Sequence, residues 1–188
     1  MLKEEVNKAL EVLQNGGIIL YPTDTIWGIG CDATNAEAVD KIFKLKGRAE
    51  NKSLIILLDT ENKLESYISG VPEIAYDLIE YAEHPLTIVF SGAKNLAKNV
   101  INQDGSVGVR VAKHPFCQQL IQRFRKPIVS TSANLSGQTF SGNFSDISDE
   151  IINGVDFVVD FEQEKQINTR PSTIMKLEPD GRFTFIRR

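Results

Sequence analysis

The spacing of hydrophobic residues changes repeatedly along this chain between the period of a helix and that of a strand. Within residues 3–14, four apolar residues recur at helical intervals: Val6, Ala9, Leu10 and Leu13. Gly16 and Gly17 follow as a stop signal, and residues 18–21 form a short continuous apolar run, which is typical of a buried strand. The chain therefore begins with a predicted helix that leads into a predicted strand.

The same two patterns predict most of the remaining elements. Thr34 and Glu37 have the spacing of a capping box, and the apolar stripe after them predicts a helix that ends near Gly47. Two further helices are expected, one at residues 72–81 and one beginning at His114-Pro115. Short apolar or alternating runs predict strands at residues 54–58, 86–90, 107–111, 128–129, 155–159, 172–177 and 183–186.

Helices and strands intermix along the chain, and some neighbouring strands are too close in sequence for a helical crossover. This order predicts an α/β fold with one mixed, mostly wound sheet and helices packed on it. We see no internal repeat and no linker, so residues 1–188 are expected to form a single domain. Residues 135–145, rich in Ser, Gly and Asn, are either a segment over a binding site or a plain surface loop.

Composition and charge narrow the classes of function. The 188 residues have a mass of 21.0 kDa, with 41% hydrophobic and 24% charged side chains, as in ordinary globular domains. The formal net charge of -4 and the pI near 5.3 argue against nucleic-acid binding through overall charge. Between residues 40 and 52, however, there is a local cluster of basic residues: Lys41, Lys44, Lys46, Arg48 and Lys52.

Cysteine usage and the N-terminal sequence indicate a compartment. Cys31 and Cys117 make no disulfide framework, and His84 and His114 do not have the spacing of a zinc motif. The charged N-terminus has no signal-peptide pattern, and no apolar run is long enough to cross a membrane. We therefore expect a cytoplasmic protein with no membrane partner.

Two short polar motifs beside predicted strands carry the most specific chemistry. Lys46-Gly47-Arg48 supplies a point charge and a planar donor fork, and Ser132-Ala133-Asn134 supplies a hydroxyl and an amide. These groups are what a polyphosphate needs. Arg110 alternates with the valines of the strand at residues 107–111, so it leaves the opposite face, where a ligand could meet it.

Other familiar motifs are out of context or absent. Residues 28–33 fit the dinucleotide pattern G-x-G-x-x-A, but six residues separate them from the strand ending at Tyr21, and Glu50 follows a helix rather than a strand. We expect instead that Gly28 and Gly30 let the backbone pass close to a neighbour. No Walker A sequence and no G-x-S-x-G elbow is present. Ser132 has no histidine base nearby in sequence, so we interpret it as a phosphate or metal contact.

Several segments match, in order, the motifs of one known family. The chain resembles the Sua5/YciO/YrdC family over nearly its whole length. Several motifs found in the same order identify a family more specifically than any single motif does. The segments are Tyr21-Pro22-Thr23-Asp24-Thr25-Ile26-Trp27-Gly28, Lys46-Gly47-Arg48, Ser53-Leu54-Ile55, Pro85-Leu86-Thr87, Val109-Arg110-Val111 before His114-Pro115, Ser130-Thr131-Ser132-Ala133-Asn134-Leu135-Ser136-Gly137 and Ser172-Thr173-Ile174. The C-terminal extension of longer relatives is missing, so the single-domain branch is the expected one.

The resemblance implies a fold and a reaction. It implies a single-domain YrdC-like α/β fold whose large twisted sheet surrounds a positively lined concave cavity. The implied enzyme is a nucleotidyltransferase that converts L-threonine, bicarbonate and ATP into threonylcarbamoyl-AMP and pyrophosphate, for the t6A modification at position 37 of tRNA. An anionic carbamate must then attack an anionic phosphate, so charge neutralisation and alignment should supply most of the catalysis.

The resemblance also implies roles for particular residues. The catalytic set is Lys46, Arg48, Ser132 and Asn134, around the ATP triphosphate or its magnesium ion. Further ATP contacts are implied for Ser106, Ser130 and Arg187, and the threonine pocket is implied to consist of Thr23, Arg110 and Ser172. Mg2+ is expected to accompany ATP, and no residue is assigned as a dedicated metal ligand. Without the family pattern, Thr23 reads as a turn hydroxyl and Arg110 as a surface strand residue.

The sequence departs from the family pattern at two places. Ala82-Glu83-His84-Pro85 replaces the Trp-Pro-Gly-Pro common in relatives, and Ala49 replaces a proline, which puts the geometry of these loops in doubt.

Three other functions stay open. One is a non-catalytic factor that binds double-stranded RNA or tRNA through phosphates. Another is a YciO-like paralogue, although that branch lacks the paired motifs present here. The third is a carbamoyl-transfer domain as in hydrogenase-maturation proteins. For the synthase, a separate threonylcarbamoyl transferase complex is the expected transient partner.

Overall fold

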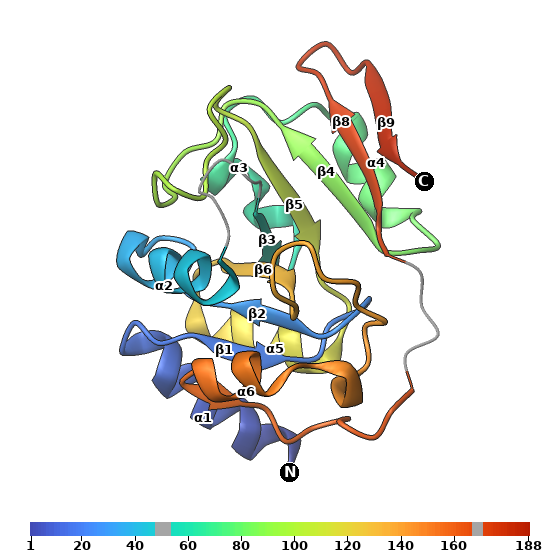
Figure 1. The fold of residues 1–188 in the computed structure, drawn as a ribbon. Helices are drawn as coiled ribbons and strands as arrows, with labels where there is room; N and C mark the ends of the chain where they lie inside the picture. Colours follow the sequence, from blue (N-terminus) through green and yellow to red (C-terminus); the bar gives the residue numbers. More distant parts are fainter. Residues whose placement is uncertain (48–53, 167–170) are drawn as a thin grey trace.

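Strands from all parts of the chain join in one mixed sheet (Figure 1). The structure, a computed structural model, describes residues 1–47, 54–166 and 171–188. In the sheet, the described strands follow the order β7 (Phe157–Val158), β1 (Ile19–Tyr21), β2 (Gly28–Gly30), β6 (Ile128–Ser132), β3 (Ile55–Leu58), β5 (Val107–Val111), β4 (Leu86–Phe90), β8 (Thr173–Leu177) and β9 (Phe183–Arg187).

The helices lie between these strands in sequence. The α-helices are α1 (Leu2–Gln14), α2 (Ala36–Lys46), α3 (Leu64–Tyr67), α4 (Ile74–Glu80), α5 (Pro115–Phe124) and α6 (Asp149–Gly154), with 3-10 turns η1 (Glu61–Lys63) and η2 (Phe144–Asp146). Most predicted elements are thereby confirmed. No helix of the described residues is long and apolar enough to cross a membrane.

The pairing confirms a mixed sheet but not a mostly wound one. The antiparallel pairs are β1/β2, β2/β6, β3/β6, β4/β5 and β8/β9, whereas only β1/β7, β3/β5 and β4/β8 are parallel among the described strands. The prediction missed β2, a three-residue strand with two glycines, because it has no hydrophobic alternation. This short strand lets β6 join the two halves of the sheet.

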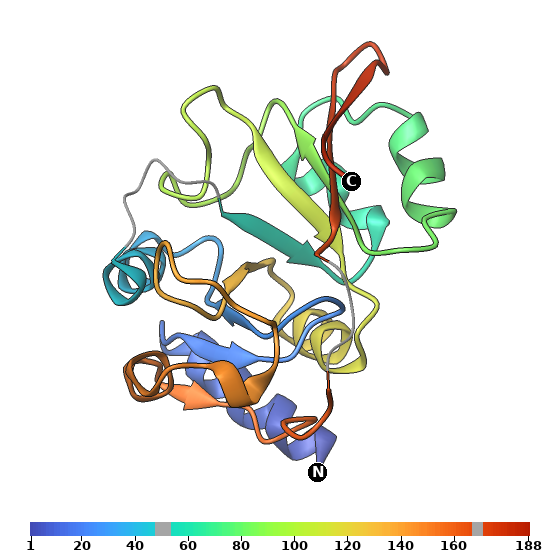
Figure 2. The ribbon, with the colours of Figure 1, turned by 45° about the vertical axis from the view of Figure 1, so that its right-hand side comes forward.

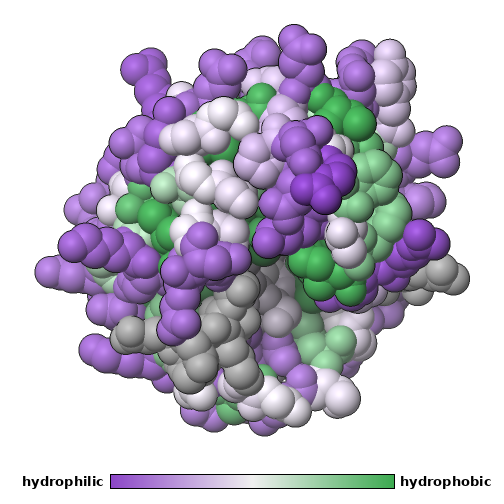
Figure 3. Space-filling view, turned by 90° about the horizontal axis from the view of Figure 1, so that it is seen from above, coloured by the Kyte–Doolittle hydropathy of each residue, from purple (hydrophilic) through white to green (hydrophobic). Residues whose placement is uncertain are grey.

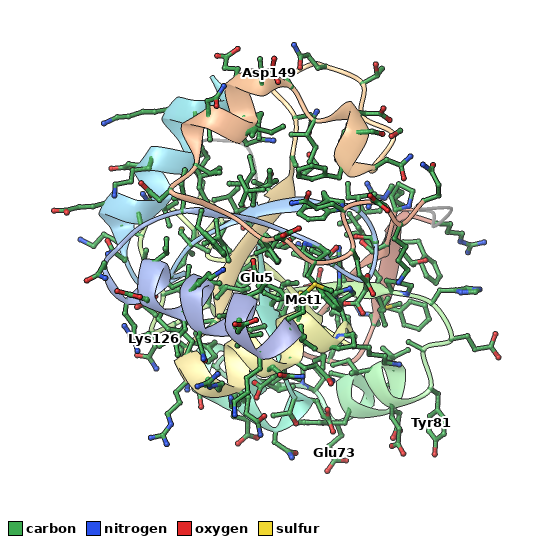
Figure 4. All side chains as sticks on the ribbon, turned by 90° about the horizontal axis from the view of Figure 1, so that it is seen from below. Met1, Glu5, Glu73, Tyr81, Lys126 and Asp149 are labelled. Carbon is green, nitrogen blue, oxygen red and sulfur yellow. The ribbon has the colours of Figure 1, made fainter. Side chains whose placement is uncertain are left out.

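Two hydrophobic clusters cover opposite faces of the sheet. On one face, α1 and α5 lie side by side (Figure 4), and Val6 and Leu13 pack with Phe116 and Leu120. Residues of the other cluster alternate with these along the strands: Leu20 and Ile56 belong to it, whereas the adjacent residues Tyr21 and Leu57 belong to the α1/α5 cluster. The N-terminus and the β8–β9 hairpin lie at opposite ends of the molecule (Figures 1 and 2).

The start of α2 differs from the predicted capping box. Asn35 is the N-cap, and its side-chain oxygen accepts a hydrogen bond from the Ala38 N–H at 3.2 Å. Thr34 instead donates its hydroxyl to the Asp32 carboxylate at 2.6 Å, because that acceptor lies closer in the turn. The predicted end is confirmed, since α2 stops at Gly47, which has a φ of 56°.

Candidate active site

A cavity of about 450 Å³ opens on the face of the sheet opposite to the larger core cluster. Gly28, Ile55 and Arg110 of the lining are sequence neighbours of Ile29, Ile56 and Val109 of that cluster, so these three lining residues share the opposite face. The lining residues are Thr23, Thr25, Ile26, Trp27, Gly28, Ile55, Thr87, Arg110, Ser130, Thr131, Ser132, Asn134, Phe140, Pro171, Ser172, Ile174 and Arg187. None of these described lining residues is acidic.

Arg110 occupies the wall of this cavity on β5. Its guanidinium donates from Nε to the Thr87 hydroxyl at 3.1 Å, from Nη1 to the Thr25 hydroxyl at 3.1 Å and from Nη2 to the Ser172 hydroxyl at 3.0 Å. The residue is only 7% exposed, and burial lowers the pKa of the guanidinium from its ordinary value, although arginine stays charged. The alternation of β5 thus points Arg110 into the cavity, as predicted.

Two hydroxyls that hold Arg110 were not among the predicted site residues. Thr87 lies on the neighbouring strand β4 and is fully buried, and it also contacts the Ser172 hydroxyl at 3.0 Å. Thr25 follows Thr23 in the loop between β1 and β2. A polar residue inside an apolar strand was a signal for Thr87, and the hydroxyl-rich loop was a signal for Thr25.

Thr23 shapes the loop that carries Thr25. Its hydroxyl donates to the Ile26 carbonyl at 2.6 Å and accepts the Thr25 N–H at 3.1 Å. The two threonine hydroxyls lie 3.2 Å apart, and both residues line the cavity. Thr23 therefore has the turn-stabilising contacts of its simpler interpretation and also lines the cavity.

A second arginine reaches the same wall from β9. Arg187 donates from Nε and Nη2 to the Ser172 carbonyl at 3.1 and 2.9 Å. Its positive charge acts on Arg110 and contributes to lowering the pKa of that guanidinium, after the larger effect of burial. Two cations thus flank Ser172 in the cavity.

The opposite wall is the end of β6 and the residues that follow it. Ser130, Ser132 and Asn134 line the cavity, with Ser130 only 8% exposed. Lys46, at the end of α2, does not line the cavity but lies directly behind this wall. Its ammonium donates to the backbone carbonyls of Ser132 and Asn134. Lys46 of the first polar motif therefore contacts the backbone of the second.

The glycines of the rejected dinucleotide motif permit close strand packing. A Cβ on Gly30 would lie 2.3 Å from the Val129 carbonyl and 2.7 Å from the Tyr21 ring. Tyr21 is fully buried there and donates its hydroxyl to the same carbonyl at 3.0 Å. These glycines lie in a strand and not at the start of a helix, which confirms that they are not a dinucleotide fingerprint.

The loop after β6 contributes to the cavity, as one of its two interpretations predicted. Phe140 lines the cavity, and the carbonyl of Gly142 accepts the Trp27 N–H at 3.1 Å. The rings of Trp27 and Phe144 have centroids 4.8 Å apart. The predicted loop at residues 135–145 is thus attached to the loop between β1 and β2.

One predicted ATP contact, Ser106, does not line the cavity. The Ser106 hydroxyl donates to Asp104 at 2.6 Å and accepts from Asn102 at 3.0 Å, in a turn before β5. Arg48 lies outside the described residues, as does Ser53 of the quoted motifs. The described residues contain no group of three or more His, Cys, Asp or Glu side chains that could hold a metal ion.

The segment that departs from the family pattern lines a neighbouring cavity. Ala82, Glu83, His84 and Pro85 form part of a hollow of about 210 Å³, and Arg110 also contacts it. The replaced loop therefore lies behind the arginine rather than in the main cavity.

Comparison with known proteins identifies the family. A family model named Sua5_yciO_yrdC, with the description "Telomere recombination", matches residues 11–188. A threonylcarbamoyl-AMP synthase from Pseudoalteromonas translucida is 36% identical to this chain over 169 residues, which cover 88% of this chain and 89% of that protein.

Two solved structures resemble the fold. The crystal structure of P. abyssi Sua5 complexed with L-threonine superposes with a TM-score of 0.82 at 27% identity, covering 92% of this chain and 50% of that chain, so this chain spans about half the length of that protein. E. coli YciO shares the fold with a TM-score of 0.84 at 23% identity, covering 100% of this chain and 90% of that chain. With the family model matching residues 11–188, this chain belongs to the Sua5/YciO/YrdC family.

Proposed function

We propose that this protein is an L-threonylcarbamoyladenylate synthase, a nucleotidyltransferase that forms threonylcarbamoyl-AMP and pyrophosphate from L-threonine, bicarbonate and ATP. The observation that carries this proposal is the guanidinium of Arg110, buried and held by three hydroxyls in a cavity whose other wall is the Ser130–Asn134 segment. The name of the bacterial relative and the threonine in the P. abyssi Sua5 crystal structure support it.

Arg110 is the proposed partner of the threonine carboxylate. A guanidinium has five N–H donors, and three of them account for its contacts with Thr25, Thr87 and Ser172. The other two suit the paired oxygens of a carboxylate. In the described part of the chain no carboxylate lies within ion-pair distance of Arg110, so an anionic ligand would be its first close counter-charge.

The proposed chemistry uses alignment and charge instead of a protein nucleophile. The threonine amine forms a bond to the carbon of bicarbonate, and loss of water gives a carbamate. A carbamate oxygen then attacks the α-phosphorus of ATP, the bond from that phosphorus to the bridging oxygen breaks, and pyrophosphate leaves. Both reactants of this second step are anions, so the proposed role of the cationic groups is to offset their repulsion.

The triphosphate is proposed to lie along the other wall. Ser130, Ser132 and Asn134 supply polar groups there, and Arg187 supplies a charge. Lys46 supports this wall from behind through the Ser132 and Asn134 carbonyls, and Arg48 is proposed to join it at the phosphates. Mg2+ would arrive with ATP as part of the substrate, since it is commonly held by phosphates, waters and few protein oxygens. The Ser132 hydroxyl is the proposed protein ligand.

Pyrophosphate release from ATP tests the proposal. Purified protein with magnesium should release pyrophosphate only when threonine and bicarbonate are both present, and either one alone should give background rates. Serine and valine in place of threonine are matched controls for the hydroxyl and the methyl group. If folded protein gives no release with both substrates, the synthase proposal is wrong, and salt-sensitive binding of double-stranded RNA becomes the activity to measure.

The chemistry of the product underlies the proposed partner and compartment of the enzyme. Threonylcarbamoyl-AMP is a mixed anhydride, so a separate threonylcarbamoyl transferase complex is proposed to take it to position 37 of tRNA in the cytoplasm. A transient contact with that complex predicts co-purification after cross-linking. The need for contact can be tested by separating this enzyme from the transferase complex with a dialysis membrane that the adenylate can cross and the proteins cannot. Equal tRNA modification with and without that membrane would contradict a need for contact.

A further inference from the structure

Thr87 is a polar residue in a fully buried position of β4. Hydrophilic side chains project around much of the rim of the molecule in the view from above, where water can satisfy their hydrogen bonds (Figure 3). Thr87 belongs to the cavity lining but is 0% exposed, so water has no access to its side chain. Among the described residues its hydroxyl meets two groups, Arg110 Nε at 3.1 Å and the Ser172 hydroxyl at 3.0 Å. This pair must therefore satisfy both the oxygen and the proton of Thr87.

The burial of Thr87 fixes the direction of its hydrogen bond to Ser172. Arg110 Nε can only donate, so the Thr87 oxygen accepts that hydrogen bond. If the Ser172 hydroxyl also donated to Thr87, the Thr87 proton would have no acceptor in the described part of the chain. A buried donor without an acceptor is costly. Thr87 therefore donates its proton to the Ser172 oxygen.

The Ser172 hydroxyl is consequently left with one proton to donate. Its oxygen accepts from Thr87 at 3.0 Å and from Arg110 Nη2 at 3.0 Å, and Arg187 Nη2 lies 3.4 Å away. Each of these neighbours is a donor toward Ser172, so none of them can accept its proton. Ser172 lines the cavity, where water or a ligand can accept it. The Ser172 proton is therefore available to the cavity beside the Arg110 guanidinium.

We propose that Thr87 is a positioning residue that directs the Ser172 proton and the Arg110 guanidinium toward one ligand carboxylate. This inference rests on the proposed function, in which that carboxylate belongs to threonine. Thr87 itself is too deeply buried to touch the ligand. It acts by holding Arg110 at Nε and by donating to Ser172. Because each donor in a series of hydrogen bonds polarises the next, the Ser172 hydroxyl becomes a stronger donor to the carboxylate.

Thr87→Val tests the proposal, because valine keeps the size of the side chain and removes its hydroxyl. Calorimetric titration of the whole protein with L-threonine should give a Kd at least about tenfold above that of the unaltered chain. Thr87→Ser keeps the hydroxyl, so its Kd should stay within about threefold of the unaltered value. In pyrophosphate release, Thr87→Val should raise the KM for threonine and leave the KM for ATP within about twofold. A general loosening of the fold would raise both constants.

A double variant tests the direction of the proton. Ser172→Ala removes the donor that Thr87 directs, so adding Thr87→Val to it should cost less than Thr87→Val costs alone. The threonine Kd of the double variant should lie at least about threefold below the value obtained by multiplying the two single effects. Effects that multiply fully would show that the two hydroxyls act independently, which would overturn the proposal.

Thr184→Val is the matched control. Thr184 is an exposed residue of β9, so the same exchange there should leave threonine binding unchanged. A Kd for Thr87→Val within about twofold of the unaltered value would overturn the inference. So would a loss of binding in Thr87→Ser as large as that in Thr87→Val, because the methyl group would then be the important part.

Two further outcomes are also decisive. If Thr87→Val does not fold, Thr87→Ser must keep threonine binding while Ser172→Ala weakens it at least about tenfold, and any other result overturns the inference. An unaltered chain that binds no threonine would overturn the proposed function together with this inference. Threonine binding that Thr87→Val leaves unchanged would overturn this inference alone.

Discussion

At the scale of single residues, Arg110 allows a direct test of substrate recognition. Arg110→Lys keeps a positive charge but removes the planar fork that reaches Thr25, Thr87 and Ser172. We expect the KM for threonine to rise about tenfold to hundredfold, or about 1.4–2.8 kcal/mol, with a smaller change in the KM for ATP. Steady-state pyrophosphate release measures both constants. Arg182→Lys, at an exposed hairpin position, is the control, and an unchanged threonine KM in Arg110→Lys would remove Arg110 from the pocket.

Glu5 gives a second prediction at this scale, on stability. Glu5 lies on α1 (Figure 4). Its carboxylate accepts hydrogen bonds from Lys8 at 2.8 Å and from the Asp160 N–H at 2.7 Å, and so connects α1 to the residue after Val159. Burial raises the pKa of Glu5, but these hydrogen bonds outweigh it and hold the pKa below the ordinary 4.5. Its stabilisation is therefore present above the unfolded pKa and is lost as pH falls through the lower folded pKa.

We expect Glu5→Gln to lower the free energy of unfolding at pH 7 by about 1–3 kcal/mol. The gap between Glu5→Gln and the unaltered chain should narrow as pH falls below 4.5. Urea unfolding at several pH values measures this gap. Glu11→Gln, on the exposed side of the same helix, should show neither effect. A gap that stays constant down to about pH 3 would mean that Glu5 stabilises the fold through its shape alone.

At the scale of elements, the loop after β6 depends on one close contact. A Cβ on Gly142 would lie 2.4 Å from the Ile26 Cγ2 atom, so Gly142→Ala must push this loop away from the loop between β1 and β2. Gly137, in the same loop, has a similar positive φ of 84°, but a Cβ there meets nothing within 4 Å. Comparing the alanine variants of Gly142 and Gly137 therefore separates the effect of the close contact with Ile26 from the cost of placing alanine at a positive φ.

Gly142→Ala should therefore destabilise the protein by about 1–3 kcal/mol more than Gly137→Ala does. Urea unfolding of both variants measures this difference. Phe140 of the same loop lines the cavity, so Gly142→Ala should also raise the KM of at least one substrate. Equal unfolding free energies in the two variants would show that the loop is not held against Ile26.

At the scale of the whole molecule, local patterns predicted the elements better than their assembly. The alternation of β5 was enough to direct Arg110 away from the valines, because side-chain direction in a strand is a local property. Thr87 meets Arg110 only because β4 and β5 are neighbours, with Ile88 opposite Val109, and no local signal fixes that pairing. Lys46 illustrates the same limit, since its carbonyl partners lie 86 and 88 residues away.

The three hydroxyl contacts of Arg110 have a consequence for the protein without its substrates. Three hydroxyl dipoles satisfy the geometry of the guanidinium but carry no net charge. Among the described residues no carboxylate lies within ion-pair distance of this buried group, and Asp24 raises its pKa only from farther away. A fold optimised for rigidity alone would place a carboxylate there. In the proposed function that role falls to the threonine carboxylate, so added threonine should raise the free energy of unfolding.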